Sequence, residues 1–189
     1  MIEFINLVKK LFPCIEPYVV AQCKDAISQF IDSGKRFECF DPQCFEFLAQ
    51  GDIIADLPFR EFLPSTGEEV LINAPGLLIS NTCDAEQDKN IVFSPIFHLQ
   101  ELGIDENNTK RNLYNQLLYF PDERYPDHIV DLSFMNTFPK TQIIEALQSK
   151  KISKRASLNI MGYYLFLCKL TVHFMRPESV EVVRTVYSP

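Results

Sequence analysis

The chain lacks several features that would assign it directly to a familiar class. It has no tryptophan and no CxxC pair, and no second cysteine pair completes a tetrahedral zinc set with Cys39 and Cys44. Its apolar runs fall short of the ~18 residues that span a bilayer. The opening segment MIEFINLVKKLF carries its glutamate before its lysines, the reverse of a secretory signal. These absences predict a cytoplasmic protein with reduced thiols, no membrane span, no metal and no other cofactor.

Histidine is sparse, and its spacing is not that of a metal site. The three histidines are His98, His128 and His173, and no two of them lie four residues apart on one helix. Each is therefore predicted to be structural rather than catalytic.

Charge is distributed unevenly along the chain. The net charge is -7, yet residues 131–189 hold eight Lys or Arg against four Asp or Glu. An acidic front and a basic tail favour either an anionic partner for the tail or a tail that docks on its own front. The overall acidity argues against strong nonspecific binding to nucleic acid.

The first 50 residues are predicted to form a helical cap. Apolar residues recur at helical spacing over 2–12 and 17–33. A third helix is expected in FDPQCFEFLAQG, where Asp41 can cap it, Pro42 suits its first position and Gly51 closes it.

Residues 51–139 have the character of a small β domain. Short β-prone runs occur in DIIADL, VLINAPGLLIS, NIVFSPIF and HIVDLSFMNTFP, and NLYNQLLYFP fits either a strand or a helix. PFREFLPSTGEE is predicted to be a loop, and Pro75-Gly76 is predicted to interrupt the second run. Residues 140–189 then add helices at TQIIEALQ and SLNIMGYYLFLCKLTVHFM and a closing strand at VEVVRTVYS. The predicted fold class is α+β.

The order of motifs resembles the core of the MazF/PemK toxin family. GDIIADL, a loop ending in GEE, a proline followed by GLLIS, and IVFSPI follow one another between Gly51 and Phe97. The resemblance implies an SH3-like barrel with terminal additions. It also implies a metal-independent endoribonuclease that dimerises and pairs with an antitoxin.

The sequence departs from this family where the chemistry is expected. The arginine that precedes the proline in the family is Ala74 here, and Ser94 is the one hydroxyl near the position of the family's threonine. An alanine cannot stabilise an anionic transition state, and losing one such donor costs roughly a hundredfold in rate. Arg60, in the predicted loop, is a candidate substitute cation, although it also fits a solvated loop charge.

Cys83-Asp84 has two interpretations. A reactive thiolate needs a nearby cation or helix N-terminus, whereas Asp84 is an anion that disfavours it. Alternatively, Cys83 finishes a buried strand while Asn81, Thr82 and Asp84 bond to the amides of a turn.

The C-terminal part offers two candidate contact surfaces. Lys150, Lys151, Lys154 and Arg155 precede an apolar helix, where they could bind phosphate or an acidic partner or could form a solvated helix start. The helix around Met161–Met175 is apolar on most faces, which indicates burial or contact with a second chain. A homodimer or a hetero-complex through this helix is therefore expected.

Two functions follow from these patterns. In the first, the chain is a binding or regulatory module of a bacterial toxin–antitoxin, defence or stress pathway, with a protein partner. In the second, it is an endoribonuclease that binds RNA and uses a relocated site made of Arg60, Cys83, Asp84 and Ser94. The two differ in whether these four residues converge in one cleft.

Overall fold

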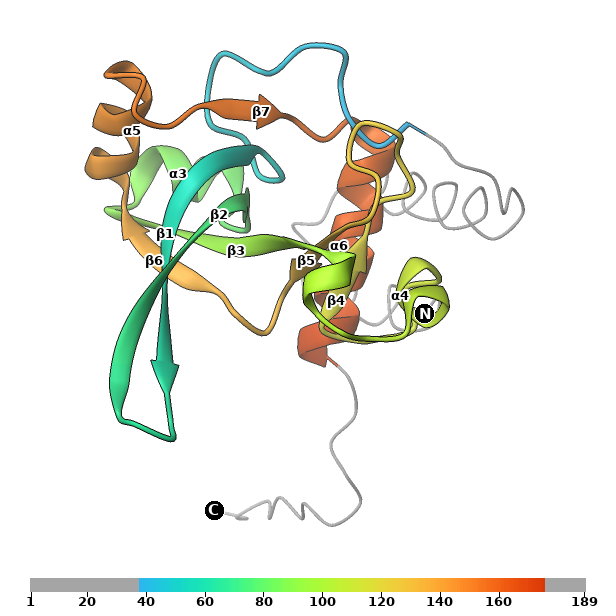
Figure 1. Cartoon of the computed structure of the whole chain (residues 1–189). Helices are drawn as coiled ribbons and strands as arrows, with labels where there is room; N and C mark the ends of the chain where they lie inside the picture. The colour runs from blue at the N-terminus through green and yellow to red at the C-terminus, as the bar shows by residue number, and fades with distance from the viewer. Residues whose placement is uncertain (1–37, 176–189) are drawn as a thin grey trace, which may run out of the picture.

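Residues 38–175, which the computed structural model describes, fold into one antiparallel sheet with helices packed against it (Figure 1). The strand order is β4-β5-β3-β2-β1-β7, and β6 pairs with β3 off this path. The predicted α+β class is confirmed. The helices predicted over 2–12 and 17–33 and the closing strand predicted over 180–188 lie outside the described residues.

The sheet begins with a long hairpin. Strand β1 (Ile53–Leu63) pairs along its length with β2 (Glu68–Leu78), with a bulge between Ile54 and Leu57. The prediction of a loop over PFREFLPSTGEE was therefore wrong for most of that segment, because Phe59 alternates inward on β1 and is fully buried. Pro75-Gly76 does not interrupt β2. A Cβ at Gly76 would lie 2.7 Å from the Leu57 side chain, so glycine permits this close packing.

Strand β3 (Asn90–His98) is the centre of the sheet. Its first half pairs with β6 (Asn136–Pro139), its middle with the end of β2, and its last residues with β5 (His128–Asp131). The segment 128–139, predicted to be a strand leading to a turn, holds a second strand after the turn. The Asp131 carboxylate accepts hydrogen bonds from the backbone and hydroxyl of Ser133 and stabilises the turn between the two strands. Strand β4 (Leu117–Tyr119) completes this side, so the ambiguous segment over 112–121 contains a strand of three residues and no helix.

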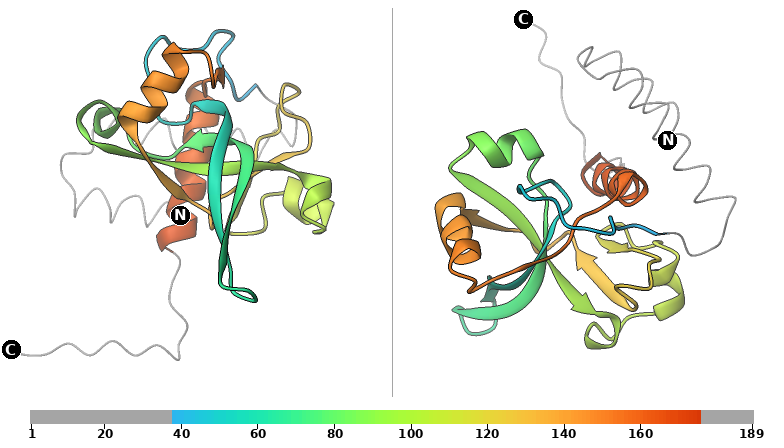
Figure 2. Two further views of the ribbon diagram at one scale, coloured as in Figure 1. Left: turned by 60° about the vertical axis from the view of Figure 1, so that its left-hand side comes forward. Right: turned by 90° about the horizontal axis from the view of Figure 1, so that it is seen from above.

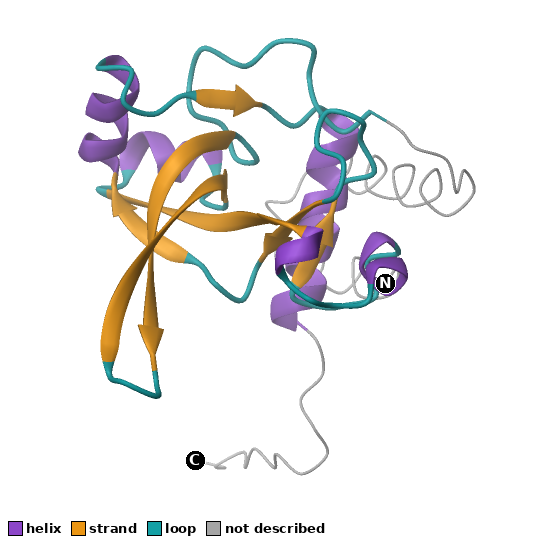
Figure 3. Cartoon of the chain, in the orientation of Figure 1, coloured by secondary structure: helices purple, strands orange, loops and turns teal. Residues whose placement is uncertain are grey.

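The helices cover the sheet at two places (Figures 2 and 3). Helix α6 (Ile160–Met175) packs through Phe166 against β4 and β5, and α5 (Lys140–Gln148) packs through Ile143 against the hairpin and β3. Both helices were predicted from the sequence. The shorter helical segments are α3 (Thr82–Gln87), η1 (Leu99–Glu101) and α4 (Glu106–Lys110). No helix of residues 38–175 is long and apolar enough to cross a membrane.

Two further segments differ from their predicted structure. No helix forms at residues 40–51, where Phe40 bridges to Leu158 and the chain runs as turns and extended backbone. Lys154 and Arg155 do not begin a helix, because they lie in β7 (Lys154–Ala156), which pairs with the start of β1. Long-range pairing determines the structure of both segments.

Candidate functional site

Arg60 lies on the hairpin and points into solvent. Its side chain is 71% exposed, and its guanidinium lies 3.6 Å from the carboxylate of Glu69 on the neighbouring strand. Its backbone is held instead: the N–H donates to Asn136 Oδ1 at 2.7 Å, and the carbonyl accepts from Asn136 Nδ2 at 3.4 Å. The backbone of Arg60 is thus anchored, whereas its guanidinium is exposed to solvent. There the Glu69 carboxylate would compete with any bound phosphate.

Ser94 occupies the opposite environment. It is fully buried in β3, and its hydroxyl donates to the carbonyl of Asp131 at 2.9 Å. The side chain of Ala74 is also buried, in the core beneath the hairpin. Neither position presents a group to solvent, so a substrate bound on the outer surface near Arg60 has no access to Ser94.

Cys83 and Asp84 lie in a helix rather than in the predicted turn. The side chain of Asn81 accepts from the Cys83 N–H at 3.0 Å, as predicted, and the Asn81 carbonyl accepts from Ala85 N–H, which begins helix α3. Thr82 Oγ1 accepts from the N–H of Gln50 at 3.0 Å. The predicted buried end of a strand at Cys83 was wrong, because the cysteine is exposed on this helix.

The four predicted catalytic residues do not come together in one cleft. Arg60 pairs with Leu71, whereas Cys83 and Asp84 follow the other end of β2 at Leu78. Seven residues of extended strand correspond to roughly 20 Å along β2. Ser94, the remaining candidate, pairs with Leu77 on β2 and is buried in the core.

The predicted basic cluster is divided by the fold. Lys150, Lys151 and Arg155 are exposed, whereas the Lys154 ammonium turns inward to a carboxylate oxygen of Asp52 at 2.6 Å. Three cations therefore remain for an external anion, and the fourth has a structural contact.

Asp52 is the centre of a buried polar network that the sequence analysis did not identify. Besides Lys154, the fully buried carboxylate accepts from the Ser157 hydroxyl at 2.6 Å and from the Ala49 N–H at 2.7 Å. Lys154 also donates to the carbonyls of Phe45 and Phe47. An aspartate directly before an apolar strand is the signal that could have drawn attention to this position. The network fixes the segment before β1 onto β7.

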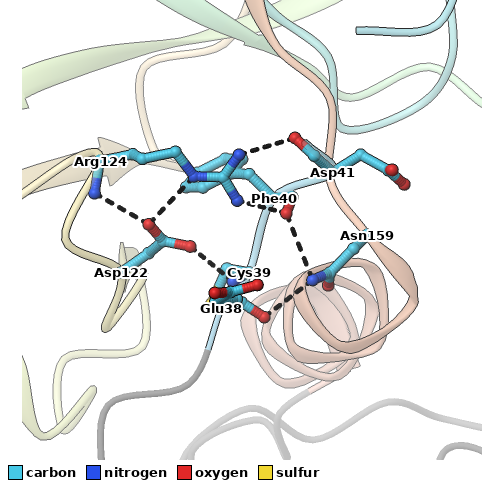
Figure 4. A network of polar contacts seen from close by, with 7 residues as sticks. All are labelled: Glu38, Cys39, Phe40, Asp41, Asp122, Arg124 and Asn159. Carbon is cyan, nitrogen blue, oxygen red and sulfur yellow. Dashed lines mark hydrogen bonds and ion pairs between the residues drawn. The ribbon is translucent and has the colours of Figure 1, made fainter. Parts of the chain in front are cut away.

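A second network joins the start of the described chain to the loop after β4 (Figure 4). The Asp122 carboxylate accepts from the N–H of Cys39 at 2.6 Å and from Arg124, and the Arg124 guanidinium donates to the carbonyls of Phe40 and Asp41. Burial raises the pKa of Asp122, but these hydrogen bonds and the guanidinium charge outweigh it and lower the pKa below its ordinary value. Burial also raises the pKa of the Cys39 thiol to about 12, which makes it an unreactive thiol.

The same network ends at the start of α6. Asn159 donates to the carbonyls of Glu38 and Phe40, and its Oδ1 accepts from the Gly162 N–H at 2.9 Å. The chain around Phe40 is therefore held between a loop and a helix end by groups that satisfy one another. Such an arrangement is a structural clasp rather than a site with free ligands.

Two of the three histidines meet across strands. His98 pairs with His128 between β3 and β5, and the ring centroids lie 5.4 Å apart. His98 caps η1 through Nδ1, which accepts from Gln100 N–H, and Nδ1 of His128 bonds to the Pro126 carbonyl. Within residues 38–175 no three His, Cys, Asp or Glu side chains are grouped to hold a metal ion.

Helix α6, the predicted partner helix, is partly used inside the fold. Tyr164 and Phe166 are buried, whereas Ile160 and Phe174 near its two ends are exposed. The other large exposed apolar side chains of the described chain lie on the segment before β1, the hairpin and the loop before β4: Phe47, Phe62, Leu71 and Leu113.

The chain's matches among known proteins are solved structures. No family model matches the chain, and no curated protein matches it. Among solved structures, the chain is similar to the "Crystal structure of MazE-MazF (Form-II) from Deinococcus radiodurans", with a TM-score of 0.40 and 12% sequence identity. The match covers 70% of this chain and 100% of that chain.

Proposed function

We propose that this protein is a MazF-like binding or regulatory module of a bacterial toxin–antitoxin, defence or stress pathway that does not cleave RNA. The proposal starts from the motif order between Gly51 and Phe97. The observation that carries it is the placement of Ser94 and Arg60, one enclosed in the core and the other on the outer surface. Acid–base cleavage needs its groups within hydrogen-bond reach of one substrate.

We further propose that the strands around β3 form a small SH3-like barrel. Asn136 at the start of β6 supports this, because its side chain bonds to both the N–H and the carbonyl of Arg60 on β1. Because an amide side chain both donates and accepts, it can take the place of a pair of backbone hydrogen bonds where two strands diverge.

The proposed activity is recognition of a protein partner. Lys150, Lys151 and Arg155 are exposed cations that fit an acidic surface, since the inward ammonium of Lys154 is already neutralised by Asp52. A tagged full-length chain is expected to retain a partner that a variant with all three cations changed to glutamate loses.

The second candidate function is an endoribonuclease with a relocated site. The 71% exposure of the Arg60 side chain favours it, because an exposed ion pair of 3.6 Å is weak enough to yield to a phosphate. For this function, Arg60 would act with Cys83 and Asp84, and Ser94 would have to become accessible.

One experiment separates these functions. Purified full-length protein is incubated with a long mixed-sequence RNA in excess chelator, beside the variants Arg60→Ala and Cys83→Ala. We expect no cleavage by any of the three, with folding of each checked by circular dichroism. Cleavage by the wild type that either variant loses would establish the nuclease and overturn the binding-module proposal.

A further inference from the structure

The far edge of strand β2 has backbone groups that face away from β1. Leu78 N–H donates to Asp52 and its carbonyl accepts from Gly51, so the backbone of Leu78 faces the β1 side, whereas Ile79 N–H donates to Val92 on β3. Because backbone groups alternate along a strand, Leu77 faces β3, and the residues four, six and eight positions before it face the same way. These residues are Asn73, Leu71 and Glu69 in order toward the hairpin turn.

The contacts of β1 give the same orientation independently. Arg60 uses its N–H and carbonyl to bond to Asn136, so these groups point away from β2. Its cross-strand partner Leu71 must then also point its N–H and carbonyl away from β1, as in every non-hydrogen-bonded pair of an antiparallel ladder.

Strand β3 does not cover this edge. Its pairing with β2 ends at Gly76 and Pro95, and the following residues of β3 pair with β5 instead. In the described part of the chain, the edge over 69–73 therefore faces no strand, and this half of the hairpin projects from the sheet (Figures 1 and 2). Pro75, which has no N–H to donate, points its nitrogen to the same side, as is usual for an edge.

The composition of this edge is unusual for one that stays uncovered. Natural edge strands are normally protected by lysine, proline or inward charges, yet the centre here reads Val70-Leu71-Ile72. Leu71 is 66% exposed, and Phe62 on the same face of β1 is 61% exposed. An edge whose three central residues are uncharged, and whose exposed Leu71 lies on the same face as the exposed Phe62, is a template for another strand.

The sequence of the edge is complementary to itself. Glu69-Val70-Leu71-Ile72-Asn73 has a polar residue at each end, a β-branched residue inside each end and leucine at the centre. We propose that this edge pairs with the same edge of a second copy of the chain, antiparallel and with the two-fold axis at Leu71. An isologous interface requires such self-complementarity.

The register follows from the two-fold axis. Leu71 lies opposite Leu71 of the second copy, Val70 opposite Ile72, and Glu69 opposite Asn73. Leu71, Glu69 and Asn73 exchange backbone hydrogen bonds, because these residues carry the outward N–H and carbonyl groups. No like charges face each other, and the Glu69 carboxylate can accept from the Asn73 amide. The two copies of Leu71 meet between the two copies of Phe62, which shields the apolar face.

The first test is the mass of the full-length protein in solution. Sedimentation equilibrium over a hundredfold range of concentration is expected to show a reversible dimer for the wild type. Leu71→Lys places two ammonium groups opposite each other and is expected to give a monomer, whereas Leu113→Lys, a matched change at an exposed leucine outside the sheet, is expected to remain dimeric. A wild type that stays monomeric, or a Leu71→Lys variant that dimerises as well as the wild type, would overturn the proposal.

The second test reads the register directly and does not depend on loss of binding. In a background where the exposed Cys44 and Cys83 are serine, Leu71→Cys is expected to cross-link to itself on mild oxidation, because directly opposed residues lie about 5.5 Å apart at Cα, within disulfide range. Glu69→Cys and Asn73→Cys are each expected to stay unlinked alone and to link when mixed. Peptide mapping assigns the bridge.

Other occupants of the edge give different results in these tests. Self-linking of Glu69→Cys would show that the two copies pair in another register, which overturns the two-fold axis at Leu71. A monomer whose edge becomes protected only by a foreign extended peptide would show hetero-pairing, which overturns pairing with a second copy. The proposal does not rest on the absence of RNA cleavage, which the nuclease assay tests separately.

Discussion

The ammonium of Lys154 and the carboxylate of Asp52 lie 2.6 Å apart, with the carboxylate fully buried and the ammonium largely so. They are separated by about a hundred residues in the sequence, and they bring the start of β1 and strand β7 together. Lys154 also holds the carbonyls of Phe45 and Phe47. This pair therefore organises the segment that precedes the sheet, and Lys154 has a folding role in place of an external one.

Breaking this pair is expected to destabilise the protein strongly. Lys154→Met leaves the Asp52 carboxylate buried with two hydrogen bonds but without its counter-ion, and removing one partner of a buried pair costs about 3–5 kcal/mol. Urea denaturation of the wild type and the variant would measure this loss.

The exposed neighbour Lys151 provides the control for this experiment. Lys151→Met removes a solvated charge from the same basic cluster and is expected to change the free energy of unfolding by less than about 0.5 kcal/mol. Equal effects of the two changes would contradict the assignment of Lys154 to the fold.

Gly162 is expected to be intolerant of alanine even though it lies in a helix. Alanine is favoured over glycine by about 1 kcal/mol in a helix interior. At this position, however, a Cβ would lie 2.1 Å from the carbonyl oxygen of Cys39, a backbone atom that the surrounding network holds in place. We expect Gly162→Ala to lower the free energy of unfolding by about 1–3 kcal/mol in thermal or urea denaturation.

Gly67 is the comparison for this substitution. A Cβ there meets nothing within 4 Å, and its positive φ of 75° leaves backbone strain as the cost, about 1 kcal/mol. If Gly67→Ala lowers the free energy of unfolding more than Gly162→Ala does, the backbone at Cys39 moves away from the added Cβ at little cost.

The regular elements were largely predictable from the sequence, because their patterns are local. Period-two alternation and turn residues indicated most strands. The apolar runs at 141–148 and 157–175 indicated two helices, which the structure has at α5 and α6. The alternation of apolar residues also continues through Phe59 into the predicted loop, but Pro58 and Pro64 made that segment look like a loop. The strand nevertheless includes Pro58, because proline is tolerated where its nitrogen faces away from the paired strand.

The segment at 40–51 shows why the rest could not be predicted. Asp41, Pro42 and Gly51 form a good helix signature, yet the backbone there bonds to Ser157 and Lys154, more than a hundred residues away. Tertiary contacts override local propensity when they satisfy the same backbone groups in a buried place. The separation of Ser94 from Arg60 has the same kind of cause, because the burial of Ser94 depends on which strands flank β3.

The buried amine of Lys169 is expected to make stability rise with pH in the alkaline range. Burial lowers the pKa of Lys169 from 10.5 to about 8, while its ammonium donates to the carbonyls of Asn112 and Tyr114. Between these two pH values the unfolded chain binds a proton that the folded chain has released, so the free energy of unfolding increases as pH rises through this window.

The difference between wild type and Lys169→Met isolates this contribution from other groups that titrate nearby. Urea denaturation at several pH values from 7.5 to 10 is expected to show that the free energy of unfolding rises more steeply with pH in the wild type than in the variant. If the free energies of unfolding of the two proteins change with pH in parallel, the hydrogen bonds to the two carbonyls keep the amine protonated in spite of its burial.

Asn136 is expected to hold the hairpin against the rest of the sheet. Asn136→Ala removes both hydrogen bonds to the backbone of Arg60, each worth about 0.5–1.5 kcal/mol, while β1 and β2 remain paired with each other. Hydrogen exchange of amides in the outer half of the hairpin is therefore expected to accelerate roughly tenfold, with little change in β5.

Arg60→Ala is the control for this experiment. It removes the exposed side chain and its contact with Glu69 but keeps the backbone hydrogen bonds, and it is expected to leave the exchange rates nearly unchanged. Acceleration in Arg60→Ala alone would assign the anchoring to the ion pair and would remove the main support for a barrel closed through Asn136.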